Sequence, residues 1–276
     1  MSGLAAGLIA LSAVLHACWN FAARKVSGDL GAIWLGLTLA CLVALPVAAL
    51  IGGAWKPALP FMAASGAVQA AYFVLLAKAY ETGEVGVVYP VARGTGVLGT
   101  AVLASALLGE RAGPGPLAGI ACVVLGVFAL ARASHQGSAK ALPYALATGA
   151  TISVYSLLDK RGVALANPFL YISGLFFIYI LLLTPYMLAF KKRELRRAWR
   201  ERRPAAVFIG LSAFSTYLLV LFAFRLAPVS LIVPFRELSV VIGAILGAVF
   251  LREAWSARKT VGLAAVAAGL ILIKLG

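Results

Sequence analysis

Charged side chains are scarce in this sequence, and acidic ones are the scarcest. Only 12% of the 276 residues are charged, and 9 of them are acidic, whereas about a quarter of the residues in a typical soluble domain are charged. With 63% hydrophobic residues and a mean hydropathy of +1.00, the chain has more apolar surface than a soluble domain can bury. A disordered chain is excluded, a water-soluble globule is strongly disfavoured, and a lipid bilayer is the expected solvent.

Cysteine is also rare, and its pattern indicates neither a disulfide framework nor a metal site. Cys18, Cys41 and Cys122 each lie inside an apolar run, with no CxxC pair and no Cys/His cluster. The sequence also lacks the GxSxG, HExxH and Walker A motifs. We therefore expect no enzyme, no metal, no cofactor and no direct use of ATP.

The charge imbalance points to a membrane rather than to nucleic acid. The formal net charge is +15, but the basic residues fall mostly in short gaps between apolar runs. This distribution is typical of membrane topology, so we expect membrane lipids and no nucleic acid as partners. The longest basic run, residues 191–203, places its loop in the cytoplasm and both termini outside under the positive-inside rule.

Long apolar runs broken by charges, prolines and glycines predict an all-α integral membrane protein with ten transmembrane helices. Each span needs about 20 apolar residues, and it must be helical because hydrocarbon offers no partner to free backbone groups. The expected spans are residues 3–23, 30–51, 58–80, 85–108, 114–132, 141–158, 168–190, 205–225, 229–250 and 256–274.

The two halves of the chain repeat one another. The segment AYETGEVGVVYPVARGTGVLG, residues 79–99, matches AFRLAPVSLIVPFRELSVVIG, residues 223–243, and each half then carries the spacing E-x8-G-x6-G. The alignment places Arg93 opposite Glu237. We therefore expect two five-helix repeats, residues 1–138 and residues 139–276.

An odd number of helices in each repeat makes the second repeat inverted in the membrane relative to the first. Inverted repeats related by an axis in the membrane plane recur in transporters, with the substrate site near the midplane between the halves. The alternative is a duplication that only builds a larger helical bundle.

This arrangement resembles the drug/metabolite transporter superfamily, in particular its EamA-type members. The likeness rests on Gly109-Glu110 followed by a Gly-spaced helix, on its echo at Arg252-Glu253, and on the opening HACWN with a basic pair. The resemblance covers essentially the whole chain. It implies an inner-membrane carrier of small polar metabolites, with a cavity lined by both halves. It also implies both termini in the cytoplasm, against the charge distribution, so the orientation stays open.

Three charged residues deep inside predicted spans mark the candidate substrate site. Arg93, Arg236 and Glu237 fall near the middle of the hydrocarbon core, where an ionic side chain faces a cavity or a partner. Pro90 and Pro234 precede them and free backbone carbonyls that can face substrate. We expect the two arginines to bind an anionic group, and Glu237 to pair with one of them or carry a proton. The alternative is a purely structural Arg93–Glu237 bridge.

Polar and aromatic residues at helical spacing complete the candidate site. His16, Trp19 and Asn20 share one face of the first span, and His16 is a second candidate proton carrier. For each of them the alternative is an ordinary contact between helices. The remaining candidates are Tyr89, Tyr155, Gln69 and Tyr72.

Charges near the ends of spans are expected to be structural. We place Asp159, Lys160 and Arg161 at the membrane interface, just after the sixth span. Glu110 and Glu253 lie near loops beside arginines, and we expect them to form caps or ion pairs rather than to bind substrate.

Together these features predict a secondary transporter of small amino-acid-like, zwitterionic or anionic metabolites. It would work by alternating access around a midplane cavity, as a monomer or a homodimer. The excess of deep positive charge, from Arg93 and Arg236 against Glu237, favours a substrate with an anionic group. The alternatives are a flippase for a lipid or lipid-linked headgroup and a membrane scaffold without transport. The sequence names neither the substrate, the direction of transport nor a coupling ion.

Overall fold

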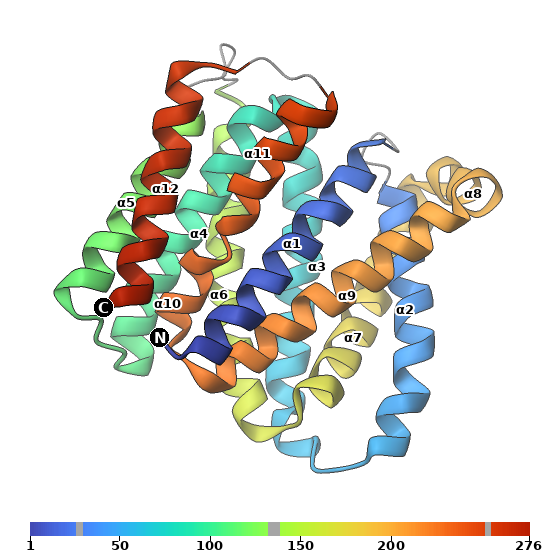
Figure 1. Ribbon diagram of the computed structural model, residues 1–276. Coiled ribbons are helices and arrows are strands. Elements are labelled where there is room, and N and C mark those ends of the chain that lie inside the picture. The colour runs from blue at the N-terminus through green and yellow to red at the C-terminus, as the bar shows by residue number, and fades with distance from the viewer. Residues whose placement is uncertain (26–29, 132–138, 252–254) are drawn as a thin grey trace.

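The computed structural model is a bundle of long helices, described for residues 1–25, 30–131, 139–251 and 255–276. For residues 20–25, 85, 131 and 251 the backbone alone is described. The described elements are α1 (Gly3–Lys25), α2 (Leu30–Ile51), η1 (Lys56–Ala58), α3 (Leu59–Thr82), α4 (Val85–Leu108), α5 (Pro114–Ala131), α6 (Leu142–Leu165), α7 (Pro168–Phe190), α8 (Lys192–Glu201), α9 (Arg203–Leu226), α10 (Val229–Phe235), α11 (Leu238–Leu251) and α12 (Ala257–Leu275). Successive long helices run alternately up and down the bundle (Figure 1).

Six helical segments of the described chain are long and apolar enough to cross a membrane. They are Leu30–Ile51, Lys56–Thr82, Gly86–Leu108, Pro168–Phe190, Arg203–Leu226 and Val229–Phe250. Shorter apolar segments, Gly3–Trp19 and Pro114–Leu130, lie in α1 and α5. The all-α, multi-pass part of the sequence prediction is therefore confirmed.

The outer surface of the bundle is apolar, as a lipid-facing surface must be. Leu50, Phe190 and Leu275 are 87%, 75% and 80% exposed, and many other large apolar side chains are also exposed around the bundle. Contiguous exposed apolar area of this extent marks a membrane or protein contact rather than a water-facing surface. The interior holds small residues and aromatic rings, including the fully buried Tyr171.

Helices occupy the positions of the expected spans, with two differences of consequence. The sixth extends through Leu165 instead of ending at residue 158, and the ninth is interrupted between α10 and α11. The sequence placed Asp159 just after the sixth span, whereas the structure has it inside α6 and buried, with 0% exposure. The next residue, Lys160, donates to the carbonyl oxygens of Phe224 and Ala227, at the C-terminal end of α9.

The helices of the two halves interleave rather than forming two separate bundles. α1 packs against α9 and α11, and α3 packs against α6 and α7. α2 packs against α7 and α9, and α4 packs against α5 and α6. The two termini lie at the same end, where the Lys274 ammonium donates to the Met1 carbonyl at 3.1 Å. Contacts between the halves therefore make up much of the core.

α5 and α12 cross closely because glycines face each other in both helices. A Cβ added to Gly126 would lie 2.7 Å from the carbonyl oxygen of Gly262, and a Cβ on Gly119 would lie 2.6 Å from that of Gly269. The pairing of an early residue of one helix with a late residue of the other makes the two helices antiparallel. Small residues permit this backbone approach, which provides van der Waals contact in a lipid environment.

The basic helix α8 lies at the end of the bundle opposite the termini (Figure 1). Ala198 is buried, whereas Trp199 is about half exposed and stacks under the Arg203 guanidinium at 4.1 Å. A short helix with an apolar inner side and arginines outside is suited to the headgroup region of a bilayer.

Glu110 closes the N-terminal end of α10 from the other half of the chain. Its carboxylate accepts hydrogen bonds from the backbone N–H of Val229 at 2.9 Å and of Ser230 at 3.0 Å, and from the Ser230 hydroxyl at 2.6 Å. A carboxylate at a helix N-terminus satisfies free N–H groups and the helix dipole. The expectation that Glu110 is a structural cap is confirmed, whereas Glu253 lies outside the described residues.

Replacement of Gly126 by alanine is expected to destabilise the protein. Alanine favours a helix over glycine by about 1 kcal/mol, but the new Cβ would meet the backbone of α12. We expect a net loss of about 1–3 kcal/mol, typical of overpacking, measured as unfolding in detergent. Gly243→Ala is the matched control, because nothing lies within 4 Å of its added Cβ. Equal stabilities for the two variants would contradict the close crossing.

Removal of the Glu110 carboxylate is expected to weaken the start of α10. Glu110→Ala leaves the two backbone donors without their acceptor, at a cost of about 0.5–2 kcal/mol. Glu201→Ala is the control, because Glu201 is exposed and pairs only with Arg197 within α8. The measurement is thermal unfolding in detergent, and an unchanged midpoint for Glu110→Ala would rule out the cap as a stabilising contact.

Candidate functional site

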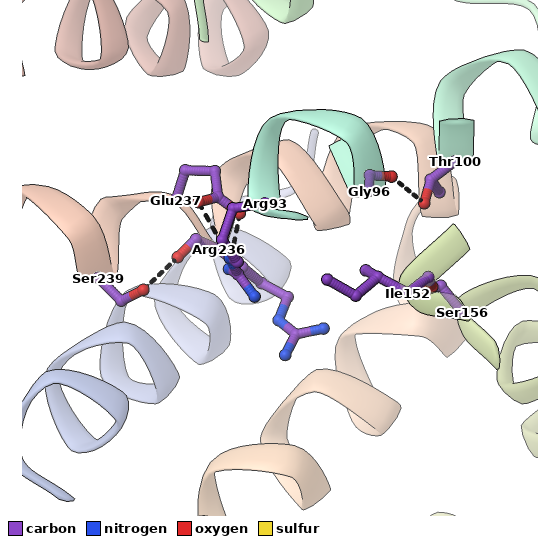
Figure 2. Close-up of polar contacts among 8 residues, drawn as sticks. All are labelled: Arg93, Gly96, Thr100, Ile152, Ser156, Arg236, Glu237 and Ser239. Atoms are coloured by element: carbon purple, nitrogen blue, oxygen red, sulfur yellow. Dashed lines mark hydrogen bonds and ion pairs between the residues drawn. The ribbon is translucent and has the colours of Figure 1, made fainter. Parts of the chain in front are cut away.

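A buried ion pair joins the two halves in the middle of the bundle. The Arg93 Nη2 lies 2.6 Å from Glu237 Oε1, and Arg93 Nε donates to Glu237 Oε2 at 3.2 Å. The two side chains are 8% and 1% exposed. Figure 2 shows this two-point contact between α4 and the segment that links α10 to α11. The Arg93–Glu237 bridge, which the sequence offered as the alternative to substrate binding, is therefore present as a contact.

The helix break between α10 and α11 places Arg236 and Glu237 side by side. Pro234 lies inside α10, and the next turns use shorter bonds, from Glu237 N–H to the Pro234 carbonyl and from Ser239 N–H to the Arg236 carbonyl. The Ser239 hydroxyl also donates to the Arg236 carbonyl at 2.9 Å (Figure 2). Proline removes a helical hydrogen bond and breaks the regular ladder. The equivalent Pro90 leaves α4 continuous.

Arg236 is a buried cation beside the Arg93–Glu237 pair. It is 8% exposed, and its Nη1 has no hydrogen-bond partner among the described residues. Its guanidinium carbon lies 5.6 Å from the centre of the Tyr217 ring. A cation over an aromatic face gains some electrostatic stabilisation, but an unpaired buried charge remains costly. This guanidinium is suited to receive an anionic group.

Aromatic rings surround the two arginines. The Arg93 guanidinium lies 5.9 Å from the Tyr89 ring, and Tyr155 contacts both Tyr72 and Tyr217 edge to face, with centroids 6.2 Å apart in each pair. The structure thus brings three predicted tyrosines, from α3, α4 and α6, to the charged centre. Tyr217, on α9, was not among the predicted site residues.

The first helix contributes part of its predicted face. His16 contacts Trp19 edge to face at 5.1 Å and lies within electrostatic range of Arg93 and Arg236. The Trp19 indole N–H is buried and has no acceptor within the described chain. The Asn20 side chain lies outside the described residues, so its predicted role is not tested.

A second buried carboxylate, Asp159, lies one helical turn beyond Tyr155. Its oxygens accept hydrogen bonds from the Tyr171 hydroxyl at 2.7 Å, from the Tyr217 hydroxyl and from the Gln69 amide at 3.4 Å. Sequence reasoning placed Asp159 at the interface and missed this contact. The signal was the spacing of Tyr155 and Asp159, which puts them on the same helix face.

The described cavities lie away from these charges. The larger one, about 260 Å³, opens beside the turn between α6 and α7 and is lined by Asn167 and Arg225 among others. The smaller one, about 10 Å³, lies among apolar side chains such as Trp34 and Met187. No group of metal-ligating side chains is found in the described part of the chain.

Comparison with known proteins identifies the same family that the sequence resembles. A model described as the EamA-like transporter family matches residues 139–275. The guanidinium exporters of Escherichia coli (strain K12) and Shigella flexneri are each 43% identical to the chain over 61 residues, 22% of this chain. The chain spans only 58% of the length of these curated relatives.

A solved crystal structure shares the fold over the full length. It covers 100% of this chain and 98% of its own, with a TM-score of 0.79 and 18% sequence identity. At this identity the likeness concerns the fold alone. The family match and the relatives point to transport rather than to catalysis. The second half of this multi-pass membrane protein, residues 139–275, is a domain of the EamA-like transporter family, within the drug/metabolite transporter superfamily.

Proposed function

We propose that the protein is a secondary transporter of the inner cell membrane that carries small metabolites with a carboxylate or a similar anionic group. The observation that carries the proposal is the buried Nη1 of Arg236, which has no hydrogen-bond partner among the described residues. The buried Trp19 indole N–H, also without an acceptor, adds a second donor in the same region. A solute anion bound to Arg236 would offset the cost of the buried charge.

Inverted repeats, residues 1–138 and 139–276, are part of this proposal. In the proposed repeats, the first half contributes α1, α2, α3, α4 and α5, which correspond in order to α6, α7, α9, α10–α11 and α12. When corresponding helices are exchanged, each main contact between helices becomes another contact that the structure also has. Arg93 and Glu237, which align in the repeat, contact each other, as residues beside a two-fold axis do. The family match also begins at residue 139. Ten spans in two inverted repeats account for all of these observations.

Alternating access in such a carrier is a rocking of the two halves about a shared central site. In the conformation described here, the Arg93–Glu237 pair holds the two halves together. The pair separates when substrate binds beside it. Trp19, Tyr72, Tyr89 and Tyr155 line the site. Gln69 contributes an amide group. Proton coupling through Glu237 or His16, and a monomeric or dimeric state, remain predictions of the sequence.

The basic helix α8 fixes the orientation that we propose. It lies at the end of the bundle opposite both termini (Figure 1). Under the positive-inside rule α8 is cytoplasmic, and both termini are therefore outside.

The curated relatives export guanidinium, which is a cation. A site whose unpaired charge is an arginine disfavours a bare cation by like-charge repulsion and favours a solute with an anionic group. We therefore propose a different cargo for this chain.

Replacement of Arg236 is expected to impair substrate binding. Arg236→Gln removes a charge-assisted hydrogen-bond donor worth about 1.5–3 kcal/mol, which corresponds to a roughly ten- to hundredfold weaker affinity for carboxylate solutes. The measurement is uptake into proteoliposomes at matched protein content. Arg225→Gln, an exposed arginine on the neighbouring helix, is the control. Equal uptake by parent and Arg236→Gln would refute the site.

The Arg93–Glu237 pair is expected to stabilise the closed packing of the two halves. Arg93→Gln leaves a buried carboxylate unpaired and costs about 3–5 kcal/mol, measured as unfolding in detergent. Because a bridge that only locks the fold tolerates neutral partners, the double variant Arg93→Gln, Glu237→Gln separates the roles. We expect the double variant to regain stability but not transport. Recovery of both would assign the pair a purely structural role.

A further inference from the structure

The exposed side of α8 carries basic side chains that have no acidic partner. Arg193, Arg196 and Arg200 follow the spacing i, i+3 and i+7, so they share one face of the helix. All three are exposed, and none forms an ion pair within the described part of the chain. Lys192 and Trp199, which are also exposed, flank the same face. This face of α8 therefore concentrates positive charge beside one aromatic ring.

The two glutamates of α8 do not neutralise this face. A Glu194 oxygen lies 3.1 Å from Lys191 Nζ, and a Glu201 oxygen lies 3.3 Å from Arg197 Nε. By helical spacing both glutamates fall on the side of the helix away from Arg196. Because each carboxylate is matched by a base next to it, the positive charge of the exposed face is left over.

Packing against α2 determines which side of α8 faces outward. Ala198 is fully buried, in a cluster with Ala32 of α2 and Ala206 of α9. A Cβ added to Gly31 would lie 2.5 Å from the carbonyl carbon of Glu194, so the backbones of α2 and α8 approach closely. The three arginines are thus held on a helix whose orientation is set by the fold, which is a requirement for a precise binding site.

The helix lies where the lipid-facing surface ends. Phe190, the last residue of α7, is exposed, and so is Phe208 near the start of α9. The basic run begins directly after the first of these apolar side chains and ends shortly before the second. Trp199 is about half exposed, and tryptophan is typical of the level of the headgroups in a bilayer. The arginine face therefore lies at the level of the lipid phosphates.

We propose that the exposed face of α8 binds the phosphate groups of anionic phospholipids in the adjacent leaflet, with Arg193, Arg196 and Arg200 as the phosphate ligands. A guanidinium matches phosphate with two parallel hydrogen bonds, whereas an ammonium group acts as a point charge. The three arginines extend along about 10 Å of helix. The inference concerns the membrane surface around the protein and is independent of the transported solute.

A basic run that only fixes membrane topology is the alternative. Topology requires positive charge on one side of the membrane and no bound ligand. The two roles differ in two measurable ways. A phosphate site gives the purified protein a preference for anionic lipid, and it discriminates arginine from lysine, although both carry the same charge.

Binding of fluorescently labelled phosphatidylglycerol to the full-length protein in detergent tests the site. The competitors are unlabelled phosphatidylglycerol, phosphatidylcholine and inorganic phosphate. We expect phosphatidylglycerol to compete at least about tenfold more strongly than phosphatidylcholine, because each basic residue near an anionic surface contributes to binding. Inorganic phosphate at the same concentration should not compete. Binding should weaken as salt rises, because the arginines are exposed to screening.

Two triple variants separate phosphate binding from charge alone. Replacement of Arg193, Arg196 and Arg200 by glutamine is expected to weaken phosphatidylglycerol binding roughly a hundredfold, from about fivefold for each residue. Replacement of the same three residues by lysine keeps the net charge, and therefore the topology. We expect the lysine variant to bind at least about threefold more weakly than the parent, because it lacks the paired donors of the guanidinium.

The matched control neutralises three exposed arginines outside α8. Arg111, Arg225 and Arg258 are replaced together by glutamine, and this variant should bind phosphatidylglycerol like the parent. A loss as large as that of the α8 glutamine variant would show that binding is spread over the basic surface, and would overturn the site.

Every other outcome also decides. Equal competition by phosphatidylglycerol and phosphatidylcholine, or parent-like binding by the glutamine variant of α8, would overturn the proposal. Equal competition by inorganic phosphate would exclude a lipid as the ligand. Parent-like binding by the lysine variant would leave only a response to charge and overturn the role of the guanidinium groups. If the glutamine variant does not insert, the lysine variant and the lipid preference of the parent decide.

Discussion

The interaction on which the rest of this structure depends is the buried contact between Arg93 and Glu237. It ties the continuous α4 of the first half to the broken helix of the second, in the buried interior of the bundle. Two ions can remain there only because each supplies the other with two close contacts. With Glu237 occupied in this way, Arg236 beside it has no carboxylate of its own.

The pairing of Glu237 with Arg93 makes the two aligned segments, residues 79–99 and 223–243, structurally different from each other. The sequence alignment pairs Arg93 with Glu237, but the two residues carry opposite charges. Arg93 lies in the continuous helix α4, whereas Glu237 lies at the break between α10 and α11. Pro90 is accommodated within α4, whereas the chain after Pro234 makes tighter turns and resumes as α11. The break places Arg236 beside Glu237, and Arg236 Nη1 has no hydrogen-bond partner among the described residues. The two aligned segments therefore contribute one ion pair, Arg93–Glu237, and a neighbouring arginine, Arg236, that takes no part in it.

The sequence predicted much of the fold because hydrophobic length is a local property. The expected spans coincide with helices, and the deep charges Arg93, Arg236 and Glu237 do lie buried together. Asp159 was missed because Asp-Lys-Arg reads locally as the end of a span. Its burial depends on donors from α3, α7 and α9, which no local pattern contains. The break after Pro234 was not distinguishable from the intact helix at Pro90, since the two segments align.

The short helix α10 belongs to the second half by sequence but is held by the first. Glu110 binds its N-terminal end, and Arg93 holds Glu237 just beyond its C-terminal end. The seven residues of α10 are thereby held at both ends by side chains of the first half of the chain. Short turns join them to the helices of the second half. Because both ends of α10 are held by residues of the first half, α10 would move with that half. Any rotation of the two halves against each other would then bend the chain at residues 226–228 and 236–238. These two joints, rather than the long helices, are where the backbone of this protein would bend.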